Sequence, residues 1–204
     1  FKALKTKRFK SPIILVASLS LLKLQMNKLG LKKKIKLINL PLLMNLKLNN
    51  RSINLINIKY NQYKPFEKLS SKSNTYVKQS FELALKILKK KITNKFINGP
   101  ISKKFFLKNK FLGITEYLAY KTRTKRYAML IYNKNLSVSP LTTHLPLKFV
   151  SKKINKNLII EKVKIINNFF RDRVGKKPKI GITGLNPHCE SIDRFNEDQK
   201  ILKP

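Results

Sequence analysis

Ile13-Ile14-Leu15-Val16-Ala17 is an unbroken apolar run, and it is the stretch of sequence that decides the fold class. Ser11-Pro12 precedes it, and a short apolar run bounded by turn residues is typical of a buried parallel strand. Residues 19–29 follow with apolar side chains at helical spacing, and Gly30 is well suited to end a helix. The sequence therefore predicts a strand that leads directly into a helix.

The rest of the chain repeats this alternation. Further strands are expected at residues 35–38, 53–58, 95–97 and 179–183, with a hairpin-like pair at 126–132 and 136–142. Further helical segments are expected at residues 75–91, 102–107, 115–122 and 157–173, and Gly175 is expected to end the last of them. Asn74 or Thr75 is the expected cap of the first of these helices. Strands that alternate with helices indicate an α/β fold with a largely parallel or mixed sheet.

The chain of 204 residues is strongly basic, with 46 Lys and Arg against 9 Asp and Glu and a formal net charge of +37. Such a charge suits a polyanionic partner, but 39 of the basic residues are Lys, in a chain that also has 20 Asn and 22 Ile. An AT-rich coding sequence favours these three residues together, whereas nucleic-acid readers depend on the bidentate contacts of Arg. We attribute the charge mainly to compositional drift. A lysine-rich nucleic-acid-binding protein, such as a ribosome-associated factor, remains the alternative.

The remaining composition limits the class of protein. Apolar residues make up 42% of the chain, which excludes a disordered polycation. No apolar run approaches the length of a membrane span. The single cysteine, Cys189, fits a reducing compartment, so we expect a cytoplasmic protein. Because the first residue is Phe1 rather than Met, we expect a fragment or a processed product.

Both histidines of the sequence directly follow predicted strands, His144 within residues 141–147 and His188 within residues 184–188. Ligand sites in parallel α/β sheets lie beyond the carboxyl ends of the strands, so two imidazoles there can bind one divalent metal ion. The alternative is a pair of solvated loop histidines, and the spacing alone leaves both interpretations open. No third histidine exists to complete a ligand set.

Two other features have weaker signals. Thr115 opens a predicted helix, where a hydroxyl either caps the helix or joins a phosphate site. Asn98-Gly99-Pro100 follows a predicted strand and can present backbone amides to an anion, although such turns are common. The six glycines form neither a dinucleotide-binding nor a P-loop fingerprint.

Four segments, taken together and in this order, resemble the signature segments of the PdxA family, the 4-hydroxythreonine-4-phosphate dehydrogenases of vitamin B6 biosynthesis. The segments are Phe96-Ile97-Asn98-Gly99-Pro100-Ile101-Ser102-Lys103, Gly113-Ile114-Thr115-Glu116-Tyr117, Thr142-Thr143-His144-Leu145-Pro146-Leu147 and Gly184-Leu185-Asn186-Pro187-His188. The strand and helix within residues 13–31 are similar to the family's second strand and helix. The resemblance covers nearly the whole chain.

The resemblance implies a fold like that of the isocitrate and isopropylmalate dehydrogenases, with two α/β domains and an active-site cleft. We expect residues 1–122 to belong to the first domain and residues 123–204 to the second, both incomplete. The family implies a homodimer whose active site uses residues of both subunits. It also implies NAD-dependent oxidation of 4-phosphooxy-L-threonine, followed by decarboxylation, with no membrane or nucleic-acid partner.

The resemblance also implies roles for individual residues. His144 and His188 match two of three histidine ligands of a divalent metal ion, such as zinc, magnesium or cobalt, which polarises the substrate oxygens. Thr115 matches a residue that contacts the substrate. Lys103 and the Asn98-Gly99-Pro100 loop match segments that line the same cleft.

The sequence departs from the family pattern at several points. Ile114 replaces a histidine and cannot hydrogen-bond the substrate, and Cys189-Glu190-Ser191 replaces a glycine-containing segment. The family's first strand and its third metal-binding histidine have no counterpart in this sequence. We therefore expect the fragment alone to bind metal weakly and to be inactive. A metal-binding or hydrolytic protein without a nicotinamide step is a third possibility.

Overall fold

The computed structural model describes residues 9–68, 70–108, 110–185, 196 and 198–204 of the chain. It divides into two compact units, Phe1–Lys110 and Phe111–Pro204, and each is described by itself. The family domains expected at residues 1–122 and 123–204 are a different division, and they stay a prediction.

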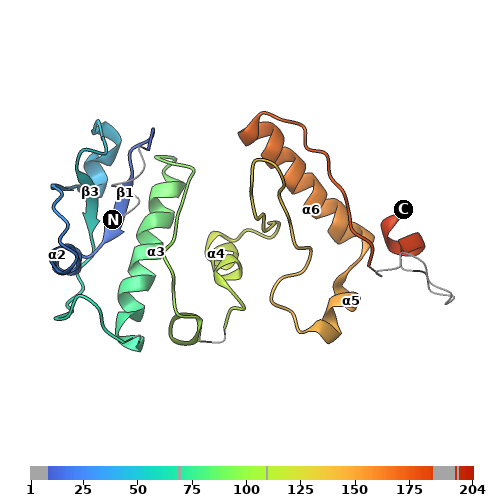
Figure 1. Ribbon diagram of the computed structural model, residues 1–204, viewed down its shortest axis with the longest axis horizontal. Helices are drawn as coiled ribbons and strands as arrows, with labels where there is room; N and C mark the ends of the chain where they lie inside the picture. The colour runs from blue at the N-terminus through green and yellow to red at the C-terminus, as the bar shows by residue number, and fades with distance from the viewer. Residues whose placement is uncertain (1–8, 69, 109, 186–195, 197) are drawn as a thin grey trace. The chain divides into compact units, whose positions relative to one another are not determined.

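The first unit is built on a parallel sheet of three strands (Figure 1). The strands are β1 (Ile14–Ala17), β2 (Ile35–Leu37) and β3 (Ile53–Asn57), and their order in the sheet is β1-β3-β2. Leu55 of β3 lies opposite Leu15 on one side and Leu37 on the other. These are the first three strands predicted from the apolar runs, so the α/β class with a parallel sheet is confirmed.

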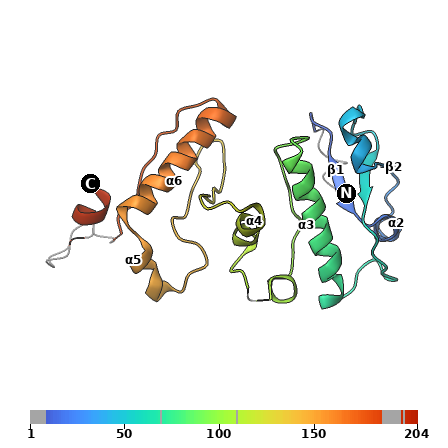
Figure 2. The ribbon, with the colours of Figure 1, turned by 180° about the vertical axis from the view of Figure 1, so that it is seen from behind.

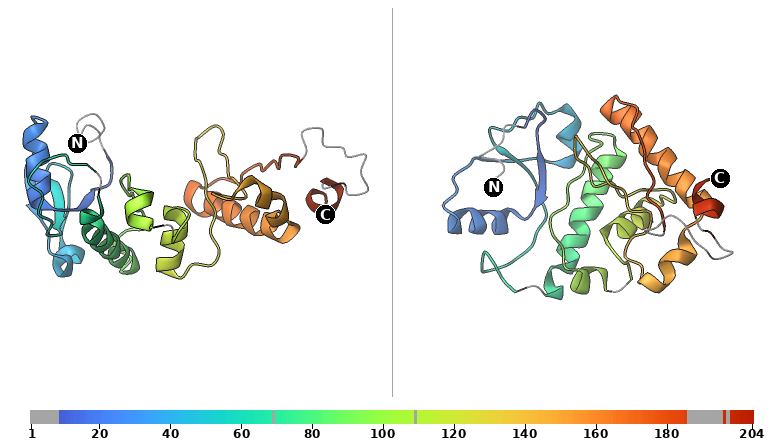
Figure 3. Two further views of the ribbon diagram at one scale, coloured as in Figure 1. Left: turned by 90° about the horizontal axis from the view of Figure 1, so that it is seen from below. Right: turned by 45° about the vertical axis from the view of Figure 1, so that its right-hand side comes forward.

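Helices cover the central strand β3 on both faces because its side chains alternate in direction. Ile53 and Leu55 pack against Leu22 and Met26 of α2 (Leu19–Lys28). On the other face, Ile56 packs in a cluster that includes Ile87 of α3 (Asn74–Lys89). Figures 2 and 3 show α3 beside β1, with which it is in contact. Burial on both faces explains why β3 carries the apolar side chains Ile53, Leu55 and Ile56, which divide between the two faces.

The ends of α2 follow the sequence prediction. Ser18 caps the helix, because its Oγ accepts the backbone N–H of Leu21 at 3.3 Å. Gly30, just beyond the last turn, has a φ of +62°, a left-handed conformation that favours glycine. The helix therefore stops where its sequence provides a residue with the required backbone freedom.

The expected cap of α3 is wrong. The helix begins at Asn74, and its N-cap is Ser73, whose side chain makes no capping hydrogen bond. Asn74 instead donates from Nδ2 to the carbonyl oxygen of Phe105 at 2.8 Å. This bond joins α3 to η3 (Lys103–Leu107), a contact distant in sequence that local cap preferences do not reveal.

Asn54 is a buried polar residue in the middle of β3, with 1% of its surface exposed. Its Nδ2 donates to the carbonyl oxygens of Ile13 at 3.0 Å and Asn49 at 2.8 Å. Replacing Asn54 with Ala is expected to destabilise the first unit by about 1–3 kcal/mol, because both bonds are lost in a buried setting. Urea unfolding measures this change. Lys36→Ala, at an exposed position of β2, is the control and should leave the unfolding midpoint almost unchanged.

The second unit is mainly helical in its described part. Its longest helix is α6 (Lys156–Phe169), which continues into the π-helical turn η5 (Phe170–Val174) and ends at Gly175 with a φ of +72°. The stop at Gly175 confirms the prediction. The other helical segments are α4 (Ile114–Thr122), η4 (Leu147–Phe149), α5 (Val150–Lys153) and η6 (Asp198–Leu202), and the first unit adds η1 (Leu40–Asn45) and η2 (Ser71–Ser73).

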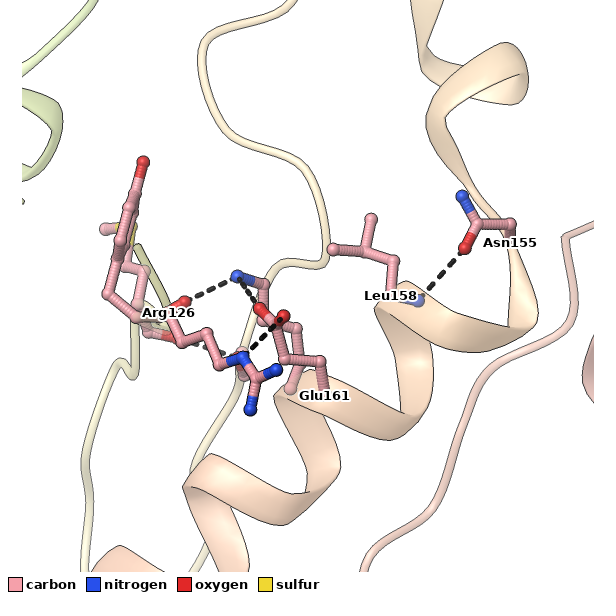
Figure 4. A network of polar contacts seen from close by, with 8 residues as sticks. Arg126, Asn155, Leu158 and Glu161 are labelled. Atoms are coloured by element: carbon pink, nitrogen blue, oxygen red, sulfur yellow. Dashed lines mark hydrogen bonds and ion pairs between the residues drawn. The ribbon is translucent and has the colours of Figure 1, made fainter. Parts of the chain in front are cut away.

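Polar contacts fix the start of α6 and the segment beside it (Figure 4). Asn155 caps the helix by accepting the N–H of Leu158 at 3.0 Å. Glu161 pairs with Arg126 at 3.7 Å, and Lys162 donates to the carbonyl oxygen of Tyr127 at 2.5 Å. The Arg126 pair is largely exposed and contributes little, so the bond from the mostly buried Lys162 is the stronger link.

Several predicted strands are absent from the described part of the chain. Residues 95–97 and 179–183 form no strand, and the predicted pair at 126–142 is reduced to one antiparallel bridge between Ile131 and Val138. A strand needs a neighbour to accept its backbone hydrogen bonds. Phe96 instead packs edge-on against Phe81, with 5.7 Å between the two ring centres. Aromatic packing, and not a strand, therefore explains the apolar side chain at position 96.

Candidate functional site

His144 has an unusual backbone conformation, with a φ of +57°. Among the described residues other than glycine, three more have a positive φ, namely Lys91, Lys108 and Arg123, and each of these directly follows a helical turn. His144 follows no helix. A left-handed backbone outside glycine costs about 1–3 kcal/mol and is often found at functional sites. The geometry therefore marks His144, the histidine that lies within the described residues, as a candidate site residue.

The imidazole of His144 and the carboxylate of Glu116 lie beside Gly113, a buried glycine. A Cβ at position 113 would lie 2.8 Å from His144 Nε2 and 2.8 Å from Glu116 Oε2. The φ of Gly113 is −160°, which any residue can adopt. This position thus needs glycine for space, because a side chain would push the imidazole and the carboxylate away.

Glu116 links the first turn of α4 to the turn that carries His144. Its Oε1 accepts a hydrogen bond from Thr143 Oγ1 at 3.1 Å. Its Oε2 is buried and has no hydrogen-bond partner in the described part of the chain. A buried carboxylate oxygen without a partner costs free energy, so it marks a place where a donor or a cation would be stabilised.

Tyr127 belongs to the same electrostatic environment. Burial raises the pKa of its phenol above the ordinary value, and the nearby negative charge of Glu116 raises the pKa further. Lys162 places its ammonium 5.1 Å from the centre of the Tyr127 ring. The carboxylate of Glu116 thus acts on the phenol as well as on the turn of residues 143–144.

Thr115 lies half-buried in the first turn of α4, next to Glu116. It does not cap the helix, because α4 begins at Ile114 and Gly113 occupies the N-cap position. The capping interpretation is therefore wrong, and substrate contact by Thr115 stays a prediction. Ile114, the residue that departs from the family pattern, is half-buried beside it.

The other predicted site residues lie elsewhere. Asn98-Gly99-Pro100 and Lys103 are exposed and belong to the first unit, where Asn98 Nδ2 donates to the carbonyl oxygen of Gly99 at 3.0 Å. His188 and Cys189 lie outside the described residues. The expected pairing of His144 with His188 therefore remains a prediction.

The described residues show only part of a possible metal site. Within them, no three His, Cys, Asp or Glu side chains converge as they would around a metal ion. One imidazole and one carboxylate oxygen that lacks a partner do lie side by side, at His144 and Glu116. An imidazole suits zinc and similar divalent ions as a ligand, and a carboxylate beside it suits them either as a second ligand or as the acceptor of the imidazole N–H, so the two groups fit the predicted metal.

Sequence reasoning identified His144 and Thr115 but gave no role to Gly113, Glu116 or Thr143. Thr143 and Glu116 are 27 residues apart, and their contact depends on how the turn folds onto α4. The available signal was their position within two quoted motifs, since Glu116 follows Thr115 and Thr143 precedes His144. Nothing in the local pattern joins the two motifs to each other.

Comparisons with known proteins agree on one family. The sequence profile described as "Pyridoxal phosphate biosynthetic protein PdxA" matches residues 8–204. A 4-hydroxythreonine-4-phosphate dehydrogenase from Sulfurihydrogenibium sp. (strain YO3AOP1) is 42% identical over 127 residues, which are 60% of this chain and 39% of that protein. The enzyme of the same name from Aquifex aeolicus is 38% identical over 103 residues, covering 49% of this chain and 32% of that protein.

Solved structures show the same fold. A crystal structure of 4-hydroxythreonine-4-phosphate dehydrogenase from Klebsiella pneumoniae matches 94% of this chain and 60% of its own, with a TM-score of 0.78 and 23% identity. The enzyme of the same name from Burkholderia phymatum matches 94% and 59% of the two chains, with a TM-score of 0.77 and 22% identity. The chain therefore spans less than two fifths of the two relatives named above and about three fifths of these structures.

Proposed function

The chain belongs to the PdxA family of pyridoxal phosphate biosynthetic proteins, and from this premise we propose that the protein is an NAD-dependent 4-hydroxythreonine-4-phosphate dehydrogenase. The observation that carries the proposal is the family match over residues 8–204, which includes the Thr115 and His144 motifs. The family expected from the sequence motifs is thereby confirmed.

The proposed reaction oxidises 4-phosphooxy-L-threonine at its hydroxyl-bearing carbon. The carbon gives its hydride to the nicotinamide of NAD, the hydroxyl loses its proton, and a ketone results. The ketone lies β to the carboxylate, and the β-keto acid loses CO₂. The enzyme must therefore hold the hydroxyl in a fixed orientation and stabilise the negative charge that develops on its oxygen.

His144 and Thr115 are the residues that we propose for this task within the described chain. The His144 imidazole would hold the divalent metal ion together with His188, and the Thr115 hydroxyl would contact the substrate. When bound, the metal supplies Lewis-acid polarisation of the substrate oxygens. Glu116 and Thr143 support the turn that carries His144, through their 3.1 Å hydrogen bond. Zinc, magnesium and cobalt are the candidate ions.

The proposed assembly follows the family. We propose a fold like that of isocitrate and isopropylmalate dehydrogenases, with the cleft between two α/β domains and the active site shared between the subunits of a homodimer. The three-stranded parallel sheet fits the first domain of such a fold. We also propose a cytoplasmic location. In the described part of the chain, no helix has the length and apolar character needed to cross a membrane.

Binding of nucleic acid is not favoured as the main function. Nucleic-acid binding would explain the charge of +37, but it explains neither the two His motifs nor the family match. A basic surface instead helps to attract a phosphorylated substrate and an anionic cofactor.

The proposed function predicts metal-dependent formation of NADH. The experiment uses the intact protein, meaning the whole chain that its gene encodes. Incubation with NAD, 4-phosphooxy-L-threonine and a divalent metal ion should raise the NADH absorbance, and a chelator should abolish the rise. L-threonine is the control substrate and should react far more slowly, because it lacks the phosphate that binding would use. No absorbance change with metal and phosphorylated substrate present would rule out the proposed activity.

A further inference from the structure

Glu116 lies beside both His144 and the residue before it, Thr143. Its Oε1 accepts the Thr143 hydroxyl at 3.1 Å, which ties the carboxylate to the turn. Its Oε2 lies over Gly113, 2.8 Å from the position that a Cβ there would occupy, and His144 Nε2 lies at the same distance from that position. One carboxylate thus bonds to Thr143 through Oε1, while its Oε2 and the imidazole of His144 lie on the same gap at Gly113.

The burial of Oε2 makes this arrangement informative. The atom is shielded from solvent and has no hydrogen-bond partner in the described part of the chain. An ionised oxygen in such a place is stabilised by an N–H donor or by a cation. The imidazole of His144 is able to donate an N–H and lies across the same gap left by Gly113.

We propose that Glu116 is the positioning residue of His144. Rotation of the His144 side chain brings one ring N–H onto Glu116 Oε2, and the other ring nitrogen then stays free to bind the metal ion. A carboxylate that accepts the second N–H of a metal-binding histidine fixes the ring and raises its basicity. Thr143 holds the carboxylate in place through Oε1, and Gly113 provides the room. This inference rests on the proposed function, because it takes His144 as a metal ligand.

Two other roles for Glu116 predict different results. As a plain structural residue it would stabilise the N-terminus of α4, where acidic side chains are favourable, without affecting metal binding. As a direct ligand it would be part of the metal coordination, and its loss would change the geometry at the ion. A metal with a visible absorption spectrum separates all three roles.

The experiment uses Co²⁺ as the probe and measures its affinity for the intact protein and its absorption spectrum when bound. Glu116→Gln keeps the shape of the side chain and an oxygen for Thr143, but it removes the charge. We expect its Co²⁺ affinity to fall by about 10- to 100-fold, with the spectrum of the saturated protein unchanged. Glu161→Gln is the matched control, since it removes a carboxylate that pairs with Arg126 in the same unit, and it should bind as the unaltered protein does.

Gly113→Ala tests the same geometry without changing any charge. Its backbone φ of −160° suits alanine, so the fold should persist while the added Cβ separates the ring from the carboxylate. The same loss of affinity is expected. Wild-type affinity in both Glu116→Gln and Gly113→Ala overturns the positioning role, and an altered Co²⁺ spectrum in Glu116→Gln overturns it in favour of direct ligation.

A third variant separates this inference from the proposed function. His144→Ala should lose Co²⁺ binding if His144 is a ligand. If His144→Ala binds Co²⁺ as the wild type does, the proposed metal site itself is wrong. If His144→Ala loses binding while Glu116→Gln and Gly113→Ala do not, only the positioning role is wrong.

Discussion

Replacing His144 with Ala in the intact protein is expected to lower the rate of NADH formation by about a hundredfold or more. A metal ion that polarises a substrate oxygen contributes several kcal/mol to the stabilisation of the transition state. Each ~1.4 kcal/mol corresponds to a factor of ten in rate. We propose two His ligands within this chain, and loss of one of them should remove much of this stabilisation of the transition state. Steady-state measurement of kcat and KM at saturating metal tests the expectation.

Two further variants make the result interpretable. His144→Asn also removes the imidazole, but asparagine tolerates the left-handed backbone of +57° at this position, so any loss of activity is not due to strain. Leu147→Ala, three residues later and 87% exposed, should keep wild-type rates. Wild-type rates in both His144 variants would remove His144 from the proposed metal site.

The parallel sheet was the most predictable part of the structure. Residues 13–17 and 53–58 are mostly apolar because side chains of β1 and β3 pack in the clusters on both faces of the sheet. Helix ends at Gly30 and Gly175 were equally visible, since both residues need a positive φ. Such features depend on a few neighbouring residues and can therefore be read locally.

Two of the failures involve partners that are distant in sequence. Ile97 ends the predicted strand of residues 95–97, yet it is 91% exposed and has no strand beside it in the described part of the chain. Asn74 was expected to cap α3, but it bonds to Phe105, 31 residues away. Local residue propensity predicts neither outcome, because each depends on whether a distant segment supplies a hydrogen-bond partner.

The candidate site shows the same division. His144 stood out as one of two histidines, whereas the roles of Glu116 and Gly113 depend on how a turn folds whose Thr143 is 27 residues from Glu116. Within the sequence, Glu116 is an ordinary acidic residue in a first helical turn. Its buried, unpartnered Oε2 becomes visible only once Gly113 and His144 are placed against it.

Replacing Leu55 with Ala is expected to destabilise the first unit by about 2–5 kcal/mol. Leu55 is fully buried in the central strand, and it packs against Leu22, Met26 and Ile53. Truncation removes the transfer free energy of the side chain and leaves a cavity between β3 and α2. The measurement is the urea midpoint in the intact protein, monitored by hydrogen exchange of residues 53–57 so that the first unit alone is followed.

Leu37→Ala is the matched control, because Leu37 lies opposite Leu55 in the sheet register but is 57% exposed on an edge strand. Its cost should stay below about 1 kcal/mol, since an exposed side chain leaves no cavity. Both variants replace leucine with alanine, and they do so on adjacent strands. Burial of the leucine is therefore the main difference between them. Equal shifts of the midpoint would mean that β3 is not the buried centre of the sheet. A large shift for Leu55→Ala alone would mean that the packing of β3 against α2 contributes much of the free energy of unfolding of this unit.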